Sequence, residues 1–510
     1  MAVLLLAFGM VALAAPGAEA ATRSTQTVVS LTFDDGDADQ MIAAKMMAGD
    51  HMAGTFYIIT GAVGDPEYLT LDNIRQISAS GNEIGGHTVS HVDLTEVSTD
   101  EARRQICGGR NILEGWGFQP TSFAYPDGAT NPAVEQIAHD CGFNSARLDG
   151  GLSSAACPGC GTAAVTSLPP RDPYAIATPS QVDSTWSLAT LEDTVTKAEK
   201  TGGWVPLVFH HVCENGEACG PLSVDSSILS AFLTWLGDRA GQGTVVKTVG
   251  EVMGGASAPQ VSAAAAAPHG VVNAGMSQDG PSGLGDSETP GAPRINDLYC
   301  WTQTGYGANT VRWQRVPGGH DGPWAEQLTM TSHSSGDAKL LPQLDLGQCA
   351  PPATAGRSYQ LTTWYESTVN TQFSVYYRTP TGRWQYWISS PFFAPSGMWS
   401  KASWQTPALP ADASAISFGL AVSAVGTLTT DDYALSAVPV APAAKTSVGP
   451  AWLPGGLPLD LLALICATII VFVIYTVRRR SVRAARERKA QIATPETEAP
   501  PPVESSSSSR

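Results

Sequence analysis

The chain has few positive charges for its length. Its 510 residues include 29 Lys and Arg against 46 Asp and Glu, which gives a formal net charge of −17 at pH 7. A nucleic-acid partner would need a basic surface to neutralise its phosphates, so the composition argues against one. Polyanionic substrates are disfavoured for the same reason unless a local basic groove exists. Neutral or cationic polymers fit the charge better.

A second Cys-x-x-Cys motif is also missing. Cys157 and Cys160 form one such motif, but zinc sites built this way usually carry two. Cys466 lies in a C-terminal apolar stretch, and the eight cysteines before it are an even number, which suits disulfides in an oxidising compartment. The simplest pairing is 107 with 141, 157 with 160, 213 with 219 and 300 with 349.

The two ends of the chain differ from its middle. Residues 1–20 are apolar and end in the small-residue spacing of a signal-peptide cleavage site, although the usual basic start is missing. Residues 457–477 are apolar apart from Asp460, over a length that can cross a bilayer. The tail 478–510 follows with eight basic and four acidic residues. By the positive-inside rule this tail is cytoplasmic, and everything before the helix is extracellular. We therefore expect a single-pass protein of the cell membrane.

Strand-like and helix-like segments alternate from residue 28 to about 253. Repeated β then α units predict a parallel sheet, either open or closed into a barrel, with functional side chains at the carboxyl ends of the strands. The predicted strands are 28–33, 54–60, 82–86, 122–125, 143–147, 204–210 and 244–249. The predicted helices are 37–50, 71–78, 99–113, 132–141, 189–201 and 226–239.

The segments after residue 253 have a different composition and hydrophobic pattern. Gly, Ala, Ser and Pro dominate residues 254–285, which predicts a flexible linker, and a similar stretch at 440–456 predicts a spacer before the membrane helix. Between them, residues 286–439 alternate in short segments that predict an antiparallel β-sandwich. Eight of the thirteen tryptophans fall in this region. They could fill the sandwich core, or some could stack on sugars in a carbohydrate-binding module.

Two adjacent carboxylates end the first predicted strand. Asp34 and Asp35 precede Gly36, and neighbouring residues at a strand end point in different directions. One carboxylate could bind a metal while the other takes a proton. Asp-Asp-Gly is also a common turn sequence, so the pair alone does not distinguish a metal site from an ordinary turn.

Histidines supply the rest of a candidate metal site. His87 and His91 are four residues apart, so both imidazoles can reach one ion. With an aspartate at a strand end they offer a two-histidine-one-carboxylate set, which leaves positions open for water and substrate. His210 and His211 end another predicted strand and could place a further histidine in the same pocket.

These residues resemble the motifs of the polysaccharide deacetylases of the NodB-homology type, carbohydrate esterase family 4. The matching segments are 32–36, 87–91, 123–128 and 207–210, and the resemblance covers residues 27–253. It implies an α/β fold in the form of a distorted (β/α) barrel, here followed by the all-β sandwich and one transmembrane helix.

The resemblance also implies a role for each site residue. Asp35, His87 and His91 would hold a divalent metal, with zinc the expected ion. Asp34 would accept a proton from the attacking water, and His210 would protonate the departing amine, with His211 as the alternative. A backbone N–H near Asp127 would help to hold the oxyanion. Leu207 and Tyr125 would line the substrate pocket.

One family residue is missing from the third motif. An arginine that contacts the base aspartate is usual where this chain has Ala124. Arg147, at the end of the next predicted strand, and Arg171 are the two candidates to replace it.

The implied function is metal-dependent removal of N-acetyl groups from amino sugars of a cell-wall or extracellular glycan. Two alternatives remain open at this point. One is an O-acetyl esterase acting on an acetylated polysaccharide, and the other is a catalytically weak surface protein that binds glycans. Neither the glycan nor the oligomeric state is indicated by the sequence.

Overall fold

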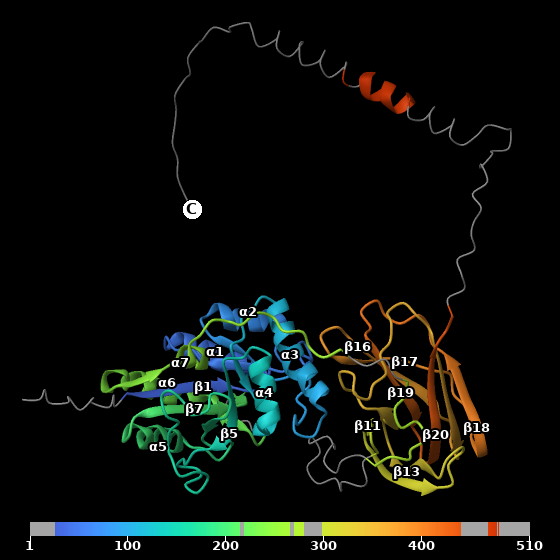
Figure 1. The fold of residues 1–510 in the computed structure, drawn as a ribbon, viewed down its shortest axis with the longest axis horizontal. Helices are drawn as coiled ribbons and strands as arrows, with labels where there is room; N and C mark the ends of the chain where they lie inside the picture. Colours follow the sequence, from blue (N-terminus) through green and yellow to red (C-terminus); the bar gives the residue numbers. More distant parts are fainter. Residues whose placement is uncertain are drawn as a thin grey trace, which may run out of the picture. The chain divides into compact units, whose positions relative to one another are not determined.

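The computed structural model describes residues 26–214, 219–265, 270–279, 298–439, 468–476 and 478 (Figure 1). The described residues up to Val438 form one compact unit, and a second unit begins at Pro439. The predicted signal peptide, the spacer 440–456 and all of the basic tail except residue 478 lie outside the described residues.

A parallel sheet built around strand β1 (Thr27–Phe33) forms the first part of the molecule. All seven residues of β1 are buried, as expected for a strand covered on both faces. β1 pairs along its whole length with β7 (Gly203–Phe209). On its other side it pairs first with β10 (Thr244–Val246) and then with β2 (Thr55–Ile58). The sheet continues through β3 (Glu83–Gly86), β4 (Ser122–Ala124), β5 (Ser145–Gly151) and β6 (Ile176–Thr178).

The sheet curls into a half-barrel. Thr166, between β5 and β6, exchanges backbone hydrogen bonds of 2.8 and 2.9 Å with Trp204 of β7. Its hydroxyl donates to the carbonyl of Ala177 in β6 at 2.9 Å. Thr166 therefore links the two ends of the sheet. The predicted α/β fold with a parallel sheet is confirmed.

Helices connect the strands, and several begin at a side-chain cap. Ser98, Asn131 and Asp225 each accept a backbone N–H of the first helical turn, which satisfies donors that a helix start leaves without a partner. Buried residues of α1, α5 and α6 share one core cluster with β1 and β7. The helices are α1 (Gln40–Gly49), α2 (Leu71–Ala79), α3 (Thr99–Gly115), α4 (Pro132–Asp140), α5 (Leu188–Glu199), α6 (Ser226–Asp238) and α7 (Val249–Met253), with short 3₁₀ turns η1 (Pro126–Gly128) and η2 (Ala240–Gln242). A separate parallel pair joins β8 (His211–Cys213) to β9 (Ser223–Asp225).

Two five-stranded antiparallel sheets form the β-sandwich, as predicted. One has the order β11-β14-β19-β16-β17 and the other β12-β13-β20-β15-β18. Their inward side chains share one hydrophobic cluster. The strands are β11 (Trp301–Tyr306), β12 (Asn309–Pro317), β13 (Trp324–His333), β14 (Asp337–Pro342), β15 (Tyr359–Ser367), β16 (Gln372–Arg378), β17 (Trp384–Ser389), β18 (Ser396–Gln405), β19 (Ala415–Val422) and β20 (Gly426–Ala437).

The described part of the predicted linker makes defined contacts. Arg110 of α3 donates to the carbonyl of Ala258 at 2.7 Å, and Asn111 donates to that of Val261 at 2.8 Å. Met276 is fully buried in the sandwich cluster. Residues 254–265 therefore lie along α3, and the sandwich core includes chain before residue 286, where its start was predicted.

The tryptophans of the sandwich are divided between core and surface. Only Trp301 of the eight is buried, and the other seven are half-buried. Trp313, Trp387 and Trp404 pack against the core cluster. Trp364 stacks instead on His320, with ring centroids 3.8 Å apart.

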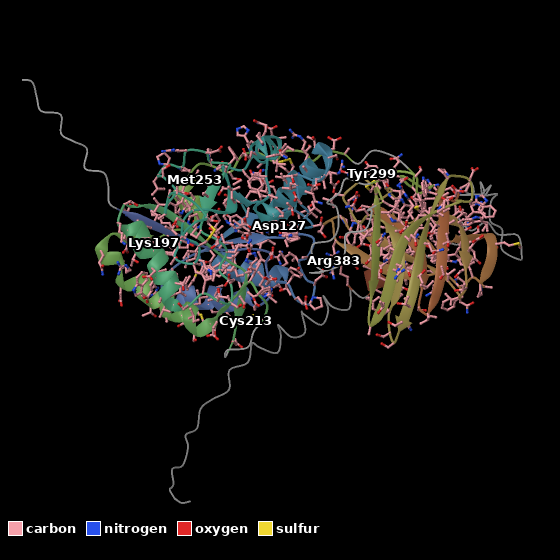
Figure 2. The ribbon with its side chains drawn as sticks, turned by 90° about the horizontal axis from the view of Figure 1, so that it is seen from below. Asp127, Lys197, Cys213, Met253, Tyr299 and Arg383 are labelled. Carbon is pink, nitrogen blue, oxygen red and sulfur yellow. A yellow bond between two sulfur atoms is a disulfide. The ribbon has the colours of Figure 1, made fainter. Side chains whose placement is uncertain are left out.

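All four predicted disulfides are present: Cys107–Cys141, Cys157–Cys160, Cys213–Cys219 and Cys300–Cys349. Disulfides are drawn as yellow bonds in Figure 2, where Cys213 is labelled. The single Cys-x-x-Cys motif is thus a disulfide, as expected.

Within the described ranges, no helix is both long and apolar enough to cross a membrane. Of the predicted membrane segment, only 468–476 is described. It is helical, and its apolar side chains from Ile469 to Tyr475 are 51% to 68% exposed. The remainder of 457–477 lies outside the described residues.

Candidate active site

The carboxyl ends of the parallel strands bring the predicted residues to one edge of the sheet. Asp34 and Asp35 follow β1, and His87 follows β3. Arg147 lies in β5, and His210 follows β7. This edge is where α/β folds carry their functional side chains.

Asp35, His87 and His91 converge on one point. Oδ1 of Asp35 lies 3.3 Å from Nε2 of His87 and 3.4 Å from Nε2 of His91. Donor atoms separated by about 3 Å suit a shared ion bound at about 2.0–2.2 Å. Oδ1 of Asp35 is buried and has no hydrogen-bond partner among the described residues. The three side chains therefore fit a divalent metal ion.

The second nitrogen of His87 is already engaged. Nδ1 lies 2.8 Å from the carbonyl oxygen of Ala124, so it carries the hydrogen, and Nε2 presents its lone pair to the metal position. A backbone carbonyl in this place orients the ring and is the usual support for a ligating histidine.

Electrostatics suit a metal ligand at Asp35. Burial raises the pKa of Asp35, but the adjacent imidazole of His87 outweighs it and holds the pKa well below its usual range. Burial and the neighbouring His87 lower the pKa of His91. Burial also acts to lower the pKa of His87, but the neighbouring carboxylates of Asp35 and Asp34 raise it above the ordinary value.

Asp34 has a different partner from its neighbour. Its side chain is buried, and its Oδ1 accepts a hydrogen bond from Nη2 of Arg147. The Arg147 side chain is 1% exposed, with its guanidinium 4.9 Å from the ring centre of Tyr57. Arg171, the other predicted candidate, is exposed between β5 and β6.

The strand register accounts for Arg147. Ala124 of β4 is the direct cross-strand partner of Arg147 in β5. Paired residues of neighbouring strands project to the same face of a sheet. A guanidinium from β5 therefore reaches the carboxylate that an arginine at position 124 would contact.

His210 and His211 face different groups. Nε2 of His210 lies 3.9 Å from Oδ2 of Asp35, and burial lowers the pKa of His210. His211 instead places Nδ1 at 2.9 Å from Oδ2 of Asp39 and 3.4 Å from Oδ2 of Asp37. His210 is thus the histidine beside the metal group.

The His211 to Asp39 contact predicts a pH-dependent stability. The hydrogen bond to Asp39 raises the pKa of His211 from 6.5 to about 9. Because the folded pKa lies above the unfolded one, the contribution is complete below pH 6.5 and is lost as pH rises through about 9. His211→Gln should therefore destabilise the protein at pH 6 and match the parent above pH 9. Urea unfolding at a series of pH values measures this, and a pH-independent difference would contradict it.

Three other predicted residues lie around the edge. Asp127 is exposed in η1, with a φ of +54°, and its negative charge acts to raise the pKa of His91. Leu207 is fully buried in the β1 core cluster. Tyr125 is also buried, and its hydroxyl donates to the carbonyl of Tyr174 at 2.9 Å. The side chains of Leu207 and Tyr125 are thus buried, and their place in the substrate pocket stays a prediction.

Gln40 was not identified from the sequence. This residue, the first of α1, is fully buried. Its Nε2 donates to the carbonyl of Asp34 and, at 3.2 Å, to that of His210. It therefore ties the ends of β1 and β7 together. Its only sequence signal is its place soon after the two aspartates, because a glutamine in a first helical turn has no distinctive pattern.

Comparison with known proteins gives a consistent picture for the first domain. Residues 21–146 match the family model described as polysaccharide deacetylase. A peptidoglycan-N-acetylglucosamine deacetylase of Bacillus cereus is 28% identical over 124 residues, covering 24% of this chain and 56% of that protein. The peptidoglycan-N-acetylmuramic acid deacetylase PdaC of Bacillus subtilis is 34% identical over 111 residues, covering 21% of this chain and 22% of PdaC.

The chain spans about half, or less, of the length of these relatives. Among solved structures, a family 4 acetyl xylan esterase from Clostridium thermocellum is 20% identical and has a TM-score of 0.32. That match covers 44% of this chain and 90% of the esterase.

Proposed function

Because residues 21–146 match the polysaccharide deacetylase family, we propose that this chain removes N-acetyl groups from amino sugars of a cell-wall or extracellular glycan in a metal-dependent reaction. The two relatives described above are named as peptidoglycan deacetylases. The net charge of −17 suits a glycan whose amines become cationic as acetyl groups leave.

The observation that carries this proposal is the separation of two adjacent carboxylates. Asp35 meets His87 and His91, whereas Asp34 meets Arg147. One carboxylate is thus available to a metal while the other stays free of it. Hydrolysis of an amide needs both a group that polarises the carbonyl and a base for the water.

A divalent cation held by Asp35, His87 and His91 would polarise the acetyl carbonyl and lower the pKa of a water. Asp34 accepts a proton from the attacking water as the water oxygen bonds to the acetyl carbon. Arg147 holds the carboxylate of Asp34 in place by its buried hydrogen bond.

The second half of the reaction needs an acid. An amine anion is too poor a leaving group, so His210 donates a proton to the nitrogen as the carbon–nitrogen bond breaks. The products are acetate and the free amino sugar. Gln40 holds the backbone of both Asp34 and His210, which fixes the distance between base and acid.

We also propose that residues 457–477 anchor the protein in the cell membrane with both folded domains outside. The exposed apolar side chains from Ile469 to Tyr475 support this, as does the basic tail that follows. Ending the chain after residue 456 should move it from the membrane fraction to the soluble fraction. Membrane retention of the shortened chain would contradict the proposal.

Removal of metal should abolish activity. Acetate release from peptidoglycan and chitin oligomers should be lost after dialysis against a chelator and return on addition of Zn²⁺. The retained circular-dichroism spectrum of the dialysed protein is the control for folding. Full acetate release from protein shown to be metal-free would refute the mechanism, and faster release from acetylated xylan would favour the O-acetyl esterase alternative.

A further inference from the structure

The short loop between the two ligand histidines has an unusual backbone. Thr88 and His91 have φ values of +65° and +54°, in the left-handed region that residues other than glycine seldom adopt. Such a conformation persists only where the surroundings enforce it. The residues that surround 87–91 therefore decide where the imidazoles point.

Gln105 of α3 is bonded to the middle of this loop. Its Oε1 accepts the backbone N–H groups of Val89 and Ser90, both at 3.1 Å. Its Nε2 donates to the hydroxyl of Ser90 at 2.8 Å. Gln105 is fully buried, so water cannot replace these hydrogen bonds without reorganisation.

The segment after β2 and a second residue of α3 also hold the loop. The N–H groups of Thr60 and Gly61, after β2, donate to the carbonyls of Thr88 and Val89 at 3.2 and 2.8 Å. On the α3 side, a Cβ atom at Gly109 would lie 3.1 Å from the carbonyl oxygen of Thr88. The backbone of the loop is thus fixed from two sides.

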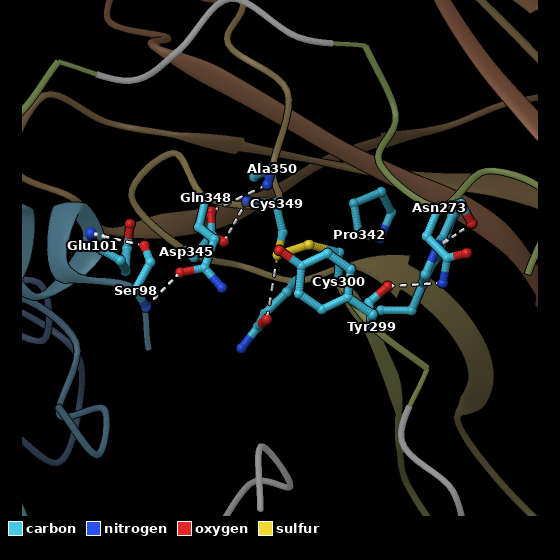
Figure 3. The surroundings of a disulfide bond; sticks show 12 residues. Ser98, Glu101, Asn273, Tyr299, Cys300, Pro342, Asp345, Gln348, Cys349 and Ala350 are labelled. Atoms are coloured by element: carbon cyan, nitrogen blue, oxygen red, sulfur yellow. Dashed lines mark hydrogen bonds between the residues drawn. A yellow bond between two sulfur atoms is a disulfide. The ribbon is translucent and has the colours of Figure 1, made fainter. Parts of the chain in front are cut away.

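Glu101 holds Gln105 and contacts the β-sandwich. Its Oε1 accepts from Nε2 of Gln105 at 3.2 Å and from the N–H of Leu346 at 2.8 Å. Nε of Arg104 bonds its other oxygen at 2.8 Å. Glu101 is 1% exposed. Figure 3 shows Glu101 beside Asp345, near the Cys300–Cys349 disulfide.

The turn between β16 and β17 contacts the loop directly. A Cβ atom at Gly382 would overlap Cγ1 of Val89. Val89 is buried, and it lies between the two ligand histidines in the sequence. The neighbouring Arg383, labelled in Figure 2, forms an ion pair with Asp65.

We propose that Gln105 is a positioning residue for the metal-binding loop and that the β-sandwich supports the same loop through Glu101 and Gly382. This inference rests on the proposed metal-dependent function. It gives the sandwich a part in forming the metal site that does not require it to bind sugar.

The first test compares Gln105→Leu with Thr194→Val in the full chain. Thr194 of α5 is also buried, and its hydroxyl donates to the carbonyl of Thr190 at 2.8 Å. Gln105→Leu should weaken zinc binding about 10–100-fold, the usual effect of losing a group that supports metal ligands. It should also speed hydrogen exchange in residues 87–91. Thr194→Val should lower the melting temperature without changing the zinc dissociation constant, which competition with a chromophoric chelator measures.

The second test uses a size exchange across the contact with Gly382. Gly382→Ala should weaken zinc binding because the added methyl displaces Val89. Adding Val89→Ala should restore the affinity, while the melting temperature stays low because φ at Gly382 is +85°. Val89→Ala alone is the control.

The outcomes separate the two proposals. Parent-like zinc affinity in both Gln105→Leu and Gly382→Ala would overturn the positioning role while leaving the deacetylase function intact. A parent protein that binds no zinc or other divalent ion would instead overturn the proposed function and the inference together.

Discussion

Asp34→Asn should lower acetate release by about 10²–10⁴-fold, the usual contribution of a positioned general base. The amide keeps the shape of the side chain but cannot accept the proton of the attacking water. Because Asp35, His87 and His91 are untouched, the metal content should not change. Steady-state acetate assays, with metal analysis of the same samples, measure both quantities.

Asp72→Asn is a suitable control for this experiment. Asp72 lies on α2 in an exposed i,i+3 pair with Arg75, so the same change of charge should leave acetate release unchanged. If Asp34→Asn retained full activity, Asp34 would not be the base. If it lost its metal as well, Asp34 and Asp35 would not act separately.

Arg147→Met should reduce the free energy of unfolding by about 3–5 kcal/mol, since removing one partner of a buried ion pair leaves the other charge uncompensated. Both side chains are almost completely buried, at 1% and 4% exposure. Urea denaturation of the parent and the variant measures the difference. Activity should fall together with stability, because Asp34 would lose the group that orients it.

A double variant distinguishes this pairing from general damage to the core. Arg147→Met combined with Asp34→Asn should recover much of the lost stability, since no buried charge remains. The surface pair provides the comparison, because Arg75→Met should cost no more than about 1 kcal/mol. A double variant as unstable as the sum of the two single variants would show that the ion pair contributes little.

The half-barrel was predictable because its sequence follows regular patterns. Buried parallel strands such as β1 are apolar throughout, and helices such as α3 begin at a recognisable cap. Strand β6 was not predicted, because Ile176–Thr178 is too short to show a period. The contacts of residues 254–265 were also missed, since a Gly- and Ala-rich segment gives no sign of the side chains that will bond its backbone.

Some residues of the candidate site were also predictable from the sequence, and others were not. Asp35, His87 and His91 stand in short motifs whose spacing is visible along the chain. The choice between Arg147 and Arg171 could not be made from the sequence, because it depends on the register of β5 against β4. Gln105 accepts backbone N–H groups of Val89 and Ser90, and Glu101 accepts that of Leu346. These partners lie outside α3, so no local pattern reveals the two residues.

The central place of β1 has a consequence for how the chain folds as it is made. Thr27 pairs with Gly203 on one side and with Thr244 on the other, so the earliest strand must wait for partners that are synthesised much later. Contacts so distant in sequence make folding slow. Asp34 and Asp35 at the end of β1 would therefore reach their final positions late, and we expect the newly made chain to acquire its metal only after residue 246 has emerged.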